Sequence, residues 1–307
     1  MTSSKVWLKA IRVPFFTATV IPIALGSIAA WHDTNSFMWI RFLWVLIGGL
    51  LIHAATNLAN DYFDYLSGCD TANLTPTPFS GGSRVLPEGL LSPKKILYAS
   101  LAAFALGSLI GLYLNYLSGK NIVLILGIIG VFLAFFYTAK PLRIGYTGFG
   151  ELAVGVGFGP LMVMGAYYVQ AQSLPFQVFL ISIPVGILIA LVLYINEFPD
   201  YTGDKMVGKN NLVVILGKKR AVILYHILLL TTYLVIVSLV LSKIVPVFCL
   251  VTLLSLPLAL KAFITAKNNF DKIYELLPAN AATIGLHSLI GILLCAGFLL
   301  DKILMRT

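Results

Sequence analysis

The amino-acid sequence predicts an all-α protein that crosses a membrane many times. Of its 307 residues, 59% are hydrophobic and only 11% are charged, whereas a soluble domain carries about a quarter charged residues. The apolar residues form nine runs, each close to the roughly 20 residues that a helix needs to cross a bilayer. Because these runs are continuously apolar and do not alternate with polar residues, membrane-spanning strands are excluded.

Nine membrane helices are expected in order along the chain. Their runs are residues 13–31, 37–60, 95–117, 121–138, 149–170, 175–196, 221–242, 244–266 and 281–300. Basic residues precede the first run, as they do in a secretory signal peptide. The run is too long for such a peptide and no clear cleavage site follows it, so we count it as the first membrane helix.

The distribution of positive charge predicts the orientation in the membrane. An odd number of spans places the two termini on opposite sides. If the N-terminus is cytoplasmic, the outer side holds only five of the 21 Lys and Arg residues, namely Arg41, Lys120, Lys243, Lys302 and Arg306, and the other 16 are cytoplasmic. We therefore expect a plasma-membrane protein with its N-terminus inside and its C-terminus outside. Topology and anionic lipid explain the net charge of +9, so no nucleic-acid partner is implied.

A short acidic phrase occurs twice, each time at the cytoplasmic end of an apolar run. Residues 60–65 are NDYFDY and residues 196–201 are NEFPDY, and a further acid, Asp70 or Asp204, follows each copy. Four expected helices separate the copies. This spacing predicts one domain over residues 1–307, built from two four-helix halves and a ninth helix. The motif-bearing segments are 57–94 and 196–220.

The side chains of the two phrases are typical ligands of a hard cation. On a helix, Asn196, Asp200 and Asp204 line one face at intervals of four residues, and Asn60 and Asp64 share that interval. Mg²⁺ favours carboxylate and amide oxygens together with substrate phosphate oxygens. No Cys or His pair accompanies the acids, which disfavours a soft transition metal. Two such sets, with Asp70, predict a site that binds one or two Mg²⁺ ions together with a diphosphate. The alternative explanation of these residues is that they cap helix ends and carry solvated charge at the membrane boundary.

Basic residues in the same cytoplasmic segments are candidates for binding phosphate. Arg84, Lys140, Arg143 and Lys209 lie in the connections that carry or flank the acids, and Arg12 precedes the first apolar run. Guanidinium and ammonium groups bind phosphate oxygens.

Three further residues, ahead of or between the motifs, are candidates for the site or for its surroundings. His53 and Asn57 lie one to two turns before the first motif and are candidates for contacts with the substrates, although a buried, hydrogen-bonded histidine is the commoner arrangement. Glu151 begins an apolar run. It is either a pocket acid or part of a polar network at the cytoplasmic end, and we favour the network.

These residues resemble the UbiA superfamily of intramembrane prenyltransferases over essentially the whole chain. The family pattern is Asn-x3-Asp with another Asp beyond it, then Asp-x3-Asp. Asn60, Asp64 and Asp70 match the first part, and Asp200 and Asp204 match the second, with Asn196 one turn ahead. Tyr137-Thr138-Ala139-Lys140 is similar to the Tyr-x3-Lys element of the family. Within the superfamily, the segments NLANDYFDY, GGSRVLPEGLLSP and NEFPDYTGDKMVGKNNLVVILG look most like the dihydroxynaphthoate prenyltransferases of menaquinone synthesis.

The resemblance implies a fold and a reaction. The expected fold has nine helices around a central cavity that opens to the cytoplasm and sideways to lipid, and the acids are expected to bind two Mg²⁺ ions. The expected reaction joins a polyprenyl diphosphate to a small aromatic acceptor such as 1,4-dihydroxy-2-naphthoate. Tyr137 would stabilise the allylic cation by a cation–π contact, and Lys140 would contact the diphosphate. Whether Asp61, Asp64 or ionisation of the substrate supplies the general base stays open.

Two kinds of alternative remain at the level of sequence. One keeps the chemistry and changes the acceptor, to 4-hydroxybenzoate, an archaeal geranylgeranylglyceryl phosphate, a haem or a chlorophyll-type molecule. The other is an ion-coupled transporter with duplicated half-sites. Transporters place their acids near the middle of the membrane, whereas these acids lie at one boundary, which favours the enzyme.

Overall fold

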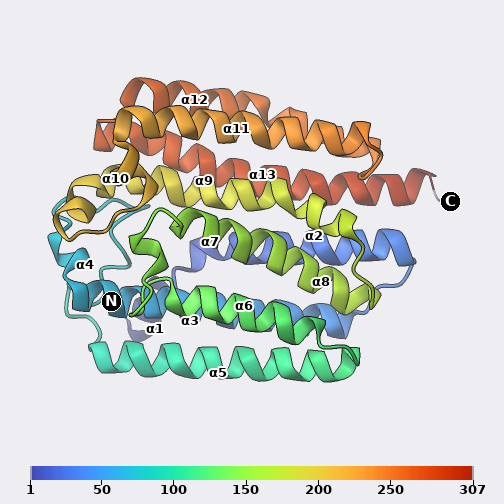
Figure 1. The fold of residues 1–307 in the computed structure, drawn as a ribbon, viewed down its shortest axis with the longest axis horizontal. Coiled ribbons are helices and arrows are strands. Elements are labelled where there is room, and N and C mark those ends of the chain that lie inside the picture. Colours follow the sequence, from blue (N-terminus) through green and yellow to red (C-terminus); the bar gives the residue numbers. More distant parts are fainter. Residues whose placement is uncertain (1, 306–307) are drawn as a thin grey trace.

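The computed structural model describes residues 2–305, so Arg306 lies outside the described residues. The regular elements in this range are helices, and the long ones run side by side along one axis (Figure 1). The N-terminal part consists of α1 (Ser3–Ala10), η1 (Val13–Phe16), α2 (Thr17–Thr34), α3 (Trp39–Ser67), α4 (Cys69–Ala72), α5 (Pro93–Ser118), α6 (Ile122–Phe136) and η2 (Ile144–Tyr146).

The C-terminal part repeats the pattern of long helices joined by short connections. It consists of α7 (Gly150–Val156), η3 (Gly157–Leu161), α8 (Met162–Ala171), α9 (Phe176–Met206), α10 (Leu212–Leu216), α11 (Lys218–Leu241), η4 (Val247–Ser255), α12 (Leu256–Asn269) and α13 (Ile273–Met305). The segments α7, η3 and α8 follow one another without a break and form one helical segment. In lipid, the backbone amides of such a segment must find hydrogen-bond partners within the helix.

Eight helical segments among residues 2–305 are long and apolar enough to cross a membrane. The ninth expected run, 121–138, forms α6, which has 15 residues and is shorter than the other eight. The expected number of nine full-length spans is therefore not confirmed. Asn121, Tyr137 and Thr138 belong to that apolar run but lie outside the helix.

Both motif-bearing helices extend beyond the apolar runs that predict them. The run 37–60 continues as α3 to Ser67, and the run 175–196 continues as α9 to Met206. The second motif is therefore helical throughout, despite Pro199. Gly68, with φ of 81°, ends α3 in the left-handed conformation typical of a helix C-terminus.

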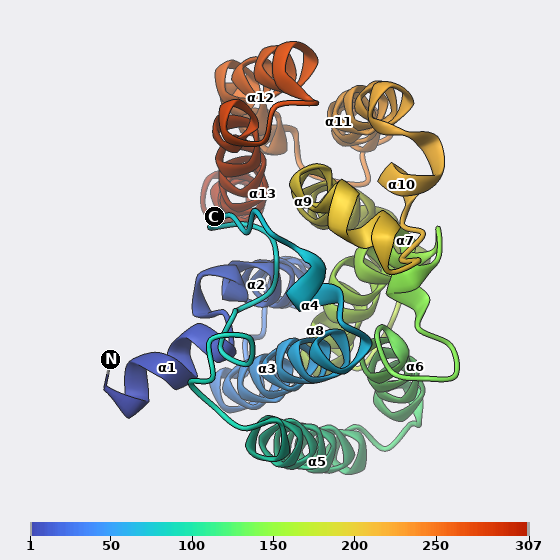
Figure 2. The ribbon, with the colours of Figure 1, turned by 90° about the vertical axis from the view of Figure 1, so that its left-hand side faces the viewer.

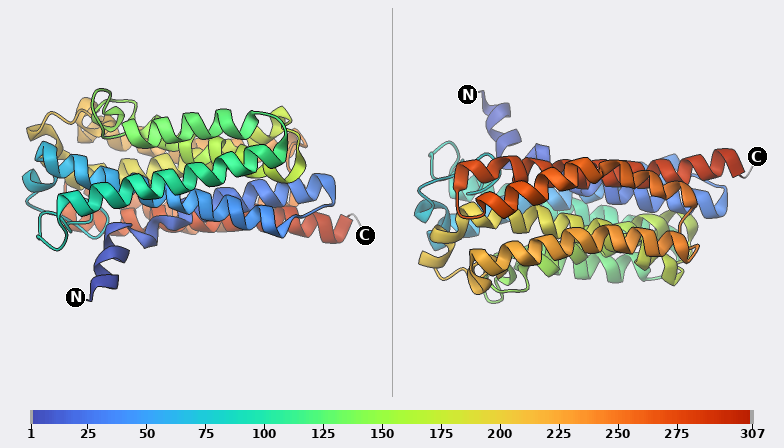
Figure 3. Two further views of the ribbon diagram at one scale, coloured as in Figure 1. Left: turned by 90° about the horizontal axis from the view of Figure 1, so that it is seen from below. Right: turned by 90° about the horizontal axis from the view of Figure 1, so that it is seen from above.

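The connections that carry the motifs gather at one end of the bundle. Figure 1 shows α1, α4 and α10 at this end and the C-terminus at the other. Seen from that end, α5 and α6 lie on the side of the bundle away from α12 and α13 (Figure 2). Helix α1 projects sideways from the bundle (Figure 3).

Close packing joins α2 to its neighbours on both sides. A Cβ atom on Gly26 would lie 2.3 Å from the carbonyl oxygen of Val163 in α8, and one on Gly291 of α13 would lie 2.1 Å from Cγ2 of Ile21 in α2. Small residues that allow backbones to approach are typical of helix contacts in membranes. The wall formed by α8, α2 and α13 is therefore tight at these positions.

Candidate active site

The two acidic motifs face one another at the end of the bundle where α3 and α9 finish. Asn60 and Asp64 lie in the last turns of α3, and after the break at Gly68 the short helix α4 carries Asp70. Asn196, Asp200 and Asp204 lie within α9. Asn60, Asp64, Asp70, Asn196, Asp200 and Asp204 all line one cavity.

Lys209 lies between the two motifs. Its Nζ is 3.8 Å from Oδ2 of Asp64 and 3.6 Å from Oδ1 of Asp204. Burial alone would lower the pKa of Lys209, but the charges of Asp204 and Asp64 outweigh burial and raise the pKa well above its ordinary value. The side chain is therefore an ammonium ion that joins α3 to the end of α9.

The first motif is held by a phenol as well as by cations. Tyr146 donates its hydroxyl to Oδ1 of Asp64 at 2.8 Å and lies 2.6 Å from Oγ of Ser67. The amide of Asn60 donates to Oδ2 of Asp64 at 3.2 Å. Arg143 stacks on the ring of Tyr146, 3.7 Å from its centroid. Arg143 thus supports the phenol that orients Asp64.

The second motif is held mainly by neutral amides. Asn73 donates to Oδ1 of Asp200 at 2.7 Å, and the backbone N–H of Gly81 donates to its Oδ2 at 3.1 Å. Asn211 donates to Oδ2 of Asp204 at 2.8 Å while its own oxygen caps α10. In the same way, Asn280 of α13 donates to Oδ1 of Asn196 at 2.8 Å. Each of the three motif side chains is oriented from a different segment of the chain.

Arg12 enters the site from the N-terminal segment. Its backbone is left-handed, with φ of 55°, and its guanidinium donates to Oδ1 of Asn60 at 2.8 Å and to Asp61. Burial lowers the pKa of Arg12, but the adjacent carboxylate of Asp61 more than compensates and the pKa is raised. Arg12 is therefore charged and lines the cavity.

The structure separates the predicted residues into those that line the cavity and those that do not. Arg12, Arg84, Lys209, Tyr137, His53 and Asn57 line it. Arg84 also donates to the backbone carbonyl of Asp70. Lys140 is exposed, and neither Lys140 nor Arg143 is among the lining residues. Only two residues separate Tyr137 from Lys140, where the family element has three.

Asp61 occupies a different position from Asp64 although both lie in the first motif. It is 2% exposed, and its carboxylate is bound by Arg12 and by the hydroxyl of Ser83. It is not among the residues that line the cavity. This position suits a residue that orients Arg12 better than a base that must reach an acceptor.

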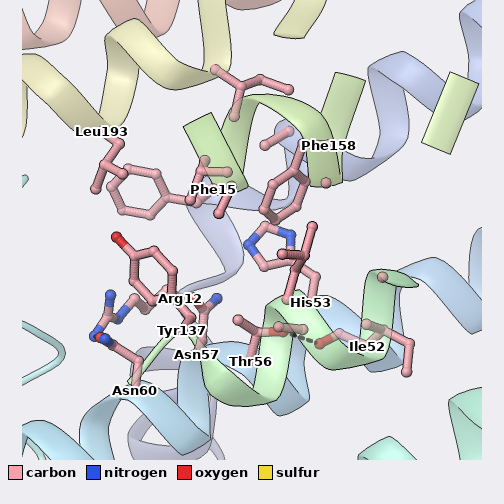
Figure 4. A pocket seen from close by; sticks show the side chains of 18 of the residues that line it. Arg12, Phe15, Ile52, His53, Thr56, Asn57, Asn60, Tyr137, Phe158 and Leu193 are labelled. Atoms are coloured by element: carbon pink, nitrogen blue, oxygen red, sulfur yellow. Dashed lines mark hydrogen bonds between the residues drawn. The ribbon is translucent and has the colours of Figure 1, made fainter. Parts of the chain in front are cut away.

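Beyond the acidic end, the cavity continues between the helices as an apolar space. Its volume is about 1180 Å³. Figure 4 shows Arg12 and Asn60 near Tyr137, with Phe15, Phe158 and Leu193 on the far side of the cavity. His53 contacts the rings of Phe16 and Phe158, and its Nδ1 lies 2.7 Å from Oγ1 of Thr19. The cavity thus joins a charged end to an aromatic middle section.

The arrangement of the acids fits an ion that also binds a substrate. Among residues 2–305, no three His, Cys, Asp or Glu side chains are close enough to hold a metal by themselves. Carboxylates and amide oxygens that face one another across a cavity, too far apart to complete a metal site alone, suit Mg²⁺. This ion keeps water molecules and takes phosphate oxygens as further ligands. Burial and then the charges of Asp64 and Asp61 raise the pKa of Asp70 to about 8. A divalent cation would relieve this crowding of negative charge.

Several residues of the site were not predicted from the sequence. They are Asn73, Tyr146, Asn211 and Asn280, which orient the acids, and Glu197, which is buried and lines the cavity. Glu151 accepts the backbone N–H of Leu212 at 2.8 Å and is not among the lining residues, as expected for a network residue. Asn211 follows Asp204 by seven residues and could have been noticed, but Asn280 carries no local signal.

The amino-acid sequence is similar to those of known prenyltransferases. Residues 19–298 match the model of the UbiA prenyltransferase family. The 1,4-dihydroxy-2-naphthoate octaprenyltransferase of Bacillus subtilis is 31% identical over 93% of this chain and 89% of its own length. The enzyme of the same description from Mycobacterium tuberculosis is 32% identical over 97% of this chain and 98% of its own.

Solved structures share the fold at low sequence identity. A UbiA homologue from Aeropyrum pernix superimposes with a TM-score of 0.68 at 15% identity, covering 92% of this chain and 98% of its own. A homologue from Archaeoglobus fulgidus, bound to GPP and Mg²⁺, gives a TM-score of 0.67 at 16% identity, covering 95% and 99%.

Proposed function

The chain belongs to the UbiA prenyltransferase family, and on this basis we propose that it transfers a polyprenyl group to an aromatic quinone precursor such as 1,4-dihydroxy-2-naphthoate. The donor is a prenyl diphosphate, the cofactor is Mg²⁺, and diphosphate is released. Relatives about 30% identical over most of the chain are dihydroxynaphthoate octaprenyltransferases. The Archaeoglobus fulgidus homologue binds GPP and Mg²⁺.

One observation carries the proposal: a single cavity has two acidic motifs and buried cations at one end and apolar walls elsewhere. A prenyl diphosphate has the same two parts, a compact anion and a long apolar tail. The charged end suits the anion and the apolar part suits the tail. We place the charged end at the cytoplasmic face, in keeping with the excess of Lys and Arg on that side.

The metal would be held from both sides of the cavity. Asp64 and Asp70, aided by Asn60, would contribute from one side, and Asp200 and Asp204, aided by Asn196, from the other, with room for two ions. When bound, Mg²⁺ neutralises the diphosphate and makes it a better leaving group.

The side chains of this protein do the remaining work of binding and orientation. Arg12, Arg84 and Lys209 line the charged end and would bind phosphate oxygens. As the carbon–oxygen bond of the donor breaks, the electron pair leaves with the diphosphate. The ring of Tyr137 would stabilise the remaining allylic cation. A carbon of the acceptor ring would then bond to this cation and lose H⁺ to a base or, at the carboxyl-bearing carbon, CO₂, which restores the aromatic ring. The buried walls exclude water, which would otherwise trap the cation.

Transfer of labelled prenyl diphosphates by purified protein in detergent tests this function. Dihydroxynaphthoate, 4-hydroxybenzoate and a prenylglyceryl phosphate would be offered in parallel, with Mg²⁺ and with EDTA. We expect Mg²⁺-dependent product with dihydroxynaphthoate. Product with another acceptor would change the acceptor only, and no product with any acceptor from folded protein would contradict the proposed function.

A further inference from the structure

His53 presents a ring nitrogen without a partner in the aromatic middle section of the cavity. The residue lines the cavity and is 5% exposed. Its Nδ1 lies 2.7 Å from Oγ1 of Thr19. Its Nε2 makes no hydrogen bond within residues 2–305, and protein atoms do not seal it off. The ring is therefore fixed through one nitrogen and offers the other to a ligand in the cavity.

The neighbouring polar side chains of α3 use their donors within the protein. The hydroxyl of Thr56 donates to the carbonyl oxygen of Ile52 at 2.7 Å, and the amide of Asn57 donates to the carbonyl oxygen of Ile11 at 2.9 Å. Both Thr56 and Asn57 line the cavity. By contrast, Nε2 of His53 donates or accepts according to the tautomer of the ring.

The side chains around His53 are aromatic. The ring of Phe158 meets that of His53 edge to face at 4.8 Å between centroids, and the ring of Phe16 lies 5.2 Å away. Figure 4 shows His53, Phe15 and Phe158 around the same part of the cavity. Aromatic walls of this kind suit a flat aromatic ligand, which stacks on them or meets them edge to face.

The ring nitrogen distinguishes an aromatic hydroxyl from a prenyl chain as the occupant of this section. A ligand that covers Nε2 displaces the hydrogen bonds that this atom makes to water. A prenyl chain has no polar atom to replace them, so the nitrogen would be left unpaired at a cost in free energy. A ring that carries a hydroxyl group satisfies both the nitrogen and the aromatic walls.

The separation between His53 and the acids is that of two reactants placed end to end. His53 and Asn60 lie on the same helix, α3, seven residues apart, which corresponds to roughly 10 Å along its axis. A diphosphate bound by the acids would place the reacting carbon of the donor between these two residues. An aromatic ring hydrogen-bonded to His53 could meet that carbon there.

We propose that Nε2 of His53 hydrogen-bonds a hydroxyl group of the aromatic acceptor, and that the section of the cavity between His53, Phe15 and Phe158 holds the acceptor ring. The identity of this occupant rests on the proposed function. A hydroxyl group both donates and accepts, so it pairs with either tautomer of the neutral imidazole. His53 thus selects a hydroxylated ring over the same ring without the hydroxyl group.

Equilibrium binding of the acceptor tests the contact without any turnover. Wild-type protein and His53→Phe, each with Mg²⁺ and diphosphate, are titrated with 1,4-dihydroxy-2-naphthoate and with the two naphthoates that lack one of its hydroxyl groups. His53→Phe should bind dihydroxynaphthoate about tenfold less tightly, because the hydroxyl group is then buried without a partner. For the naphthoate that lacks the contacted hydroxyl, the two proteins should agree within about twofold.

Three further variants separate the hydrogen bond from the shape of the cavity. His53→Gln keeps a group that donates and accepts, and its affinity for dihydroxynaphthoate should be within about threefold of wild type. Thr19→Val removes the partner of Nδ1 and should weaken binding less than His53→Phe does. His226→Phe is the control, because His226 bonds the carbonyl oxygen of Phe263 and does not line the cavity; its affinity should be that of wild type.

Two results would overturn the proposal. One is an equal weakening for all three naphthoates in folded His53→Phe, which would indicate a change in cavity shape. The other is unchanged binding of dihydroxynaphthoate together with an altered KM for long prenyl diphosphates, which would place the prenyl tail beside His53.

Failure of this contact is distinguishable from failure of the proposed function. Binding that depends on His53, without product in the transfer assay, would retain the contact and reject the reaction. Product with dihydroxynaphthoate, with the same acceptor affinity in wild type and His53→Phe, would reject the contact alone. Product with 4-hydroxybenzoate instead moves the comparison to that acid and benzoate. Absence of binding for every hydroxylated ring to folded wild-type protein would reject both.

Discussion

The two acidic motifs resemble each other in sequence but are held in place in different ways. The carboxylate of Asp64 receives a phenol, an amide and an ammonium group, from Tyr146, Asn60 and Lys209. The carboxylate of Asp200 receives an amide and a backbone N–H, from Asn73 and Gly81. The ammonium group of Lys209 contacts one acid of each motif, Asp64 and Asp204, whereas Asp200 receives only neutral donors.

The difference also extends to the backbone. In the second motif, Asp200 and Asp204 are one turn apart on the continuous helix α9. In the first motif, Gly68 separates α3 from α4, so Asp64 and Asp70 lie on different helices. We infer that the second motif, carried by one continuous helix, is a preformed half-site, and that the first, divided between α3 and α4, reaches its working arrangement when metal and diphosphate bind. The following predictions test this contrast.

The largest expected effect is the loss of one carboxylate from either motif. Asp64→Ala and Asp200→Ala should each lower transfer about 10³-fold or more, because each removes a ligand worth several kcal/mol in the charged transition state. Steady-state rates at saturating Mg²⁺ measure this effect. Asp271→Ala, at an exposed position away from the cavity, is the control. Near-normal activity in either motif variant would remove that acid from the metal site.

The next effect concerns the ammonium group that joins the motifs. Lys209→Met should raise the KM for prenyl diphosphate about 10- to 100-fold, since a buried charge-assisted contact is lost. Without substrate, the same variant should bind Mg²⁺ more tightly, because a cation that competes for Asp64 and Asp204 has gone. Calorimetry with Mg²⁺ alone measures the second part. Lys205→Met, which alters an exposed lysine on α9, should change neither quantity; weaker Mg²⁺ binding in Lys209→Met would contradict the competition.

A smaller effect is expected from the amides that orient the second motif. Asn73→Ala and Asn211→Ala should raise the Mg²⁺ concentration needed for half-maximal activity about tenfold and change kcat less, as removal of groups that orient metal ligands commonly does. Asn269→Ala removes an amide that bonds the backbone of α12 and serves as the control. If kcat fell while the Mg²⁺ requirement stayed constant, Asp200 and Asp204 would not be a preformed half-site.

Much of this arrangement could be predicted from local sequence, because it depends on local periodicity. Continuous apolar runs gave the long helices, and spacing by four residues placed Asn196, Asp200 and Asp204 on one helical face, as α9 confirms. Asp70 lies beyond the end of α3, which terminates at Gly68. The family is confirmed by the match over residues 19–298.

What could not be predicted depends on contacts between distant segments. Asp61 and Asp64 are three residues apart and similar in sequence context. Asp61 is nevertheless withdrawn from the cavity because Arg12, 49 residues earlier, passes on that side. Asn280 orients Asn196 from 84 residues away. The exposure of Lys140 depends on the path of the connection after Tyr137, which hydropathy does not describe.

The smallest expected effect is a pH dependence that originates in the first motif. The pKa of Asp70 is about 8, raised by burial and by Asp64 and Asp61, so this carboxyl is mostly protonated at pH 6.5 and mostly ionised at pH 9. A metal ion must displace the proton at the lower pH. The Mg²⁺ concentration for half-maximal activity should therefore fall as the pH rises toward 8, by at most about tenfold per pH unit for one proton, and should level off above it. Asp70→Asn removes the titrating group and should flatten this dependence while raising the Mg²⁺ requirement at every pH. If Asp70→Asn kept the full pH dependence, the titrating proton would belong to another group, and the pH dependence would not originate in the first motif.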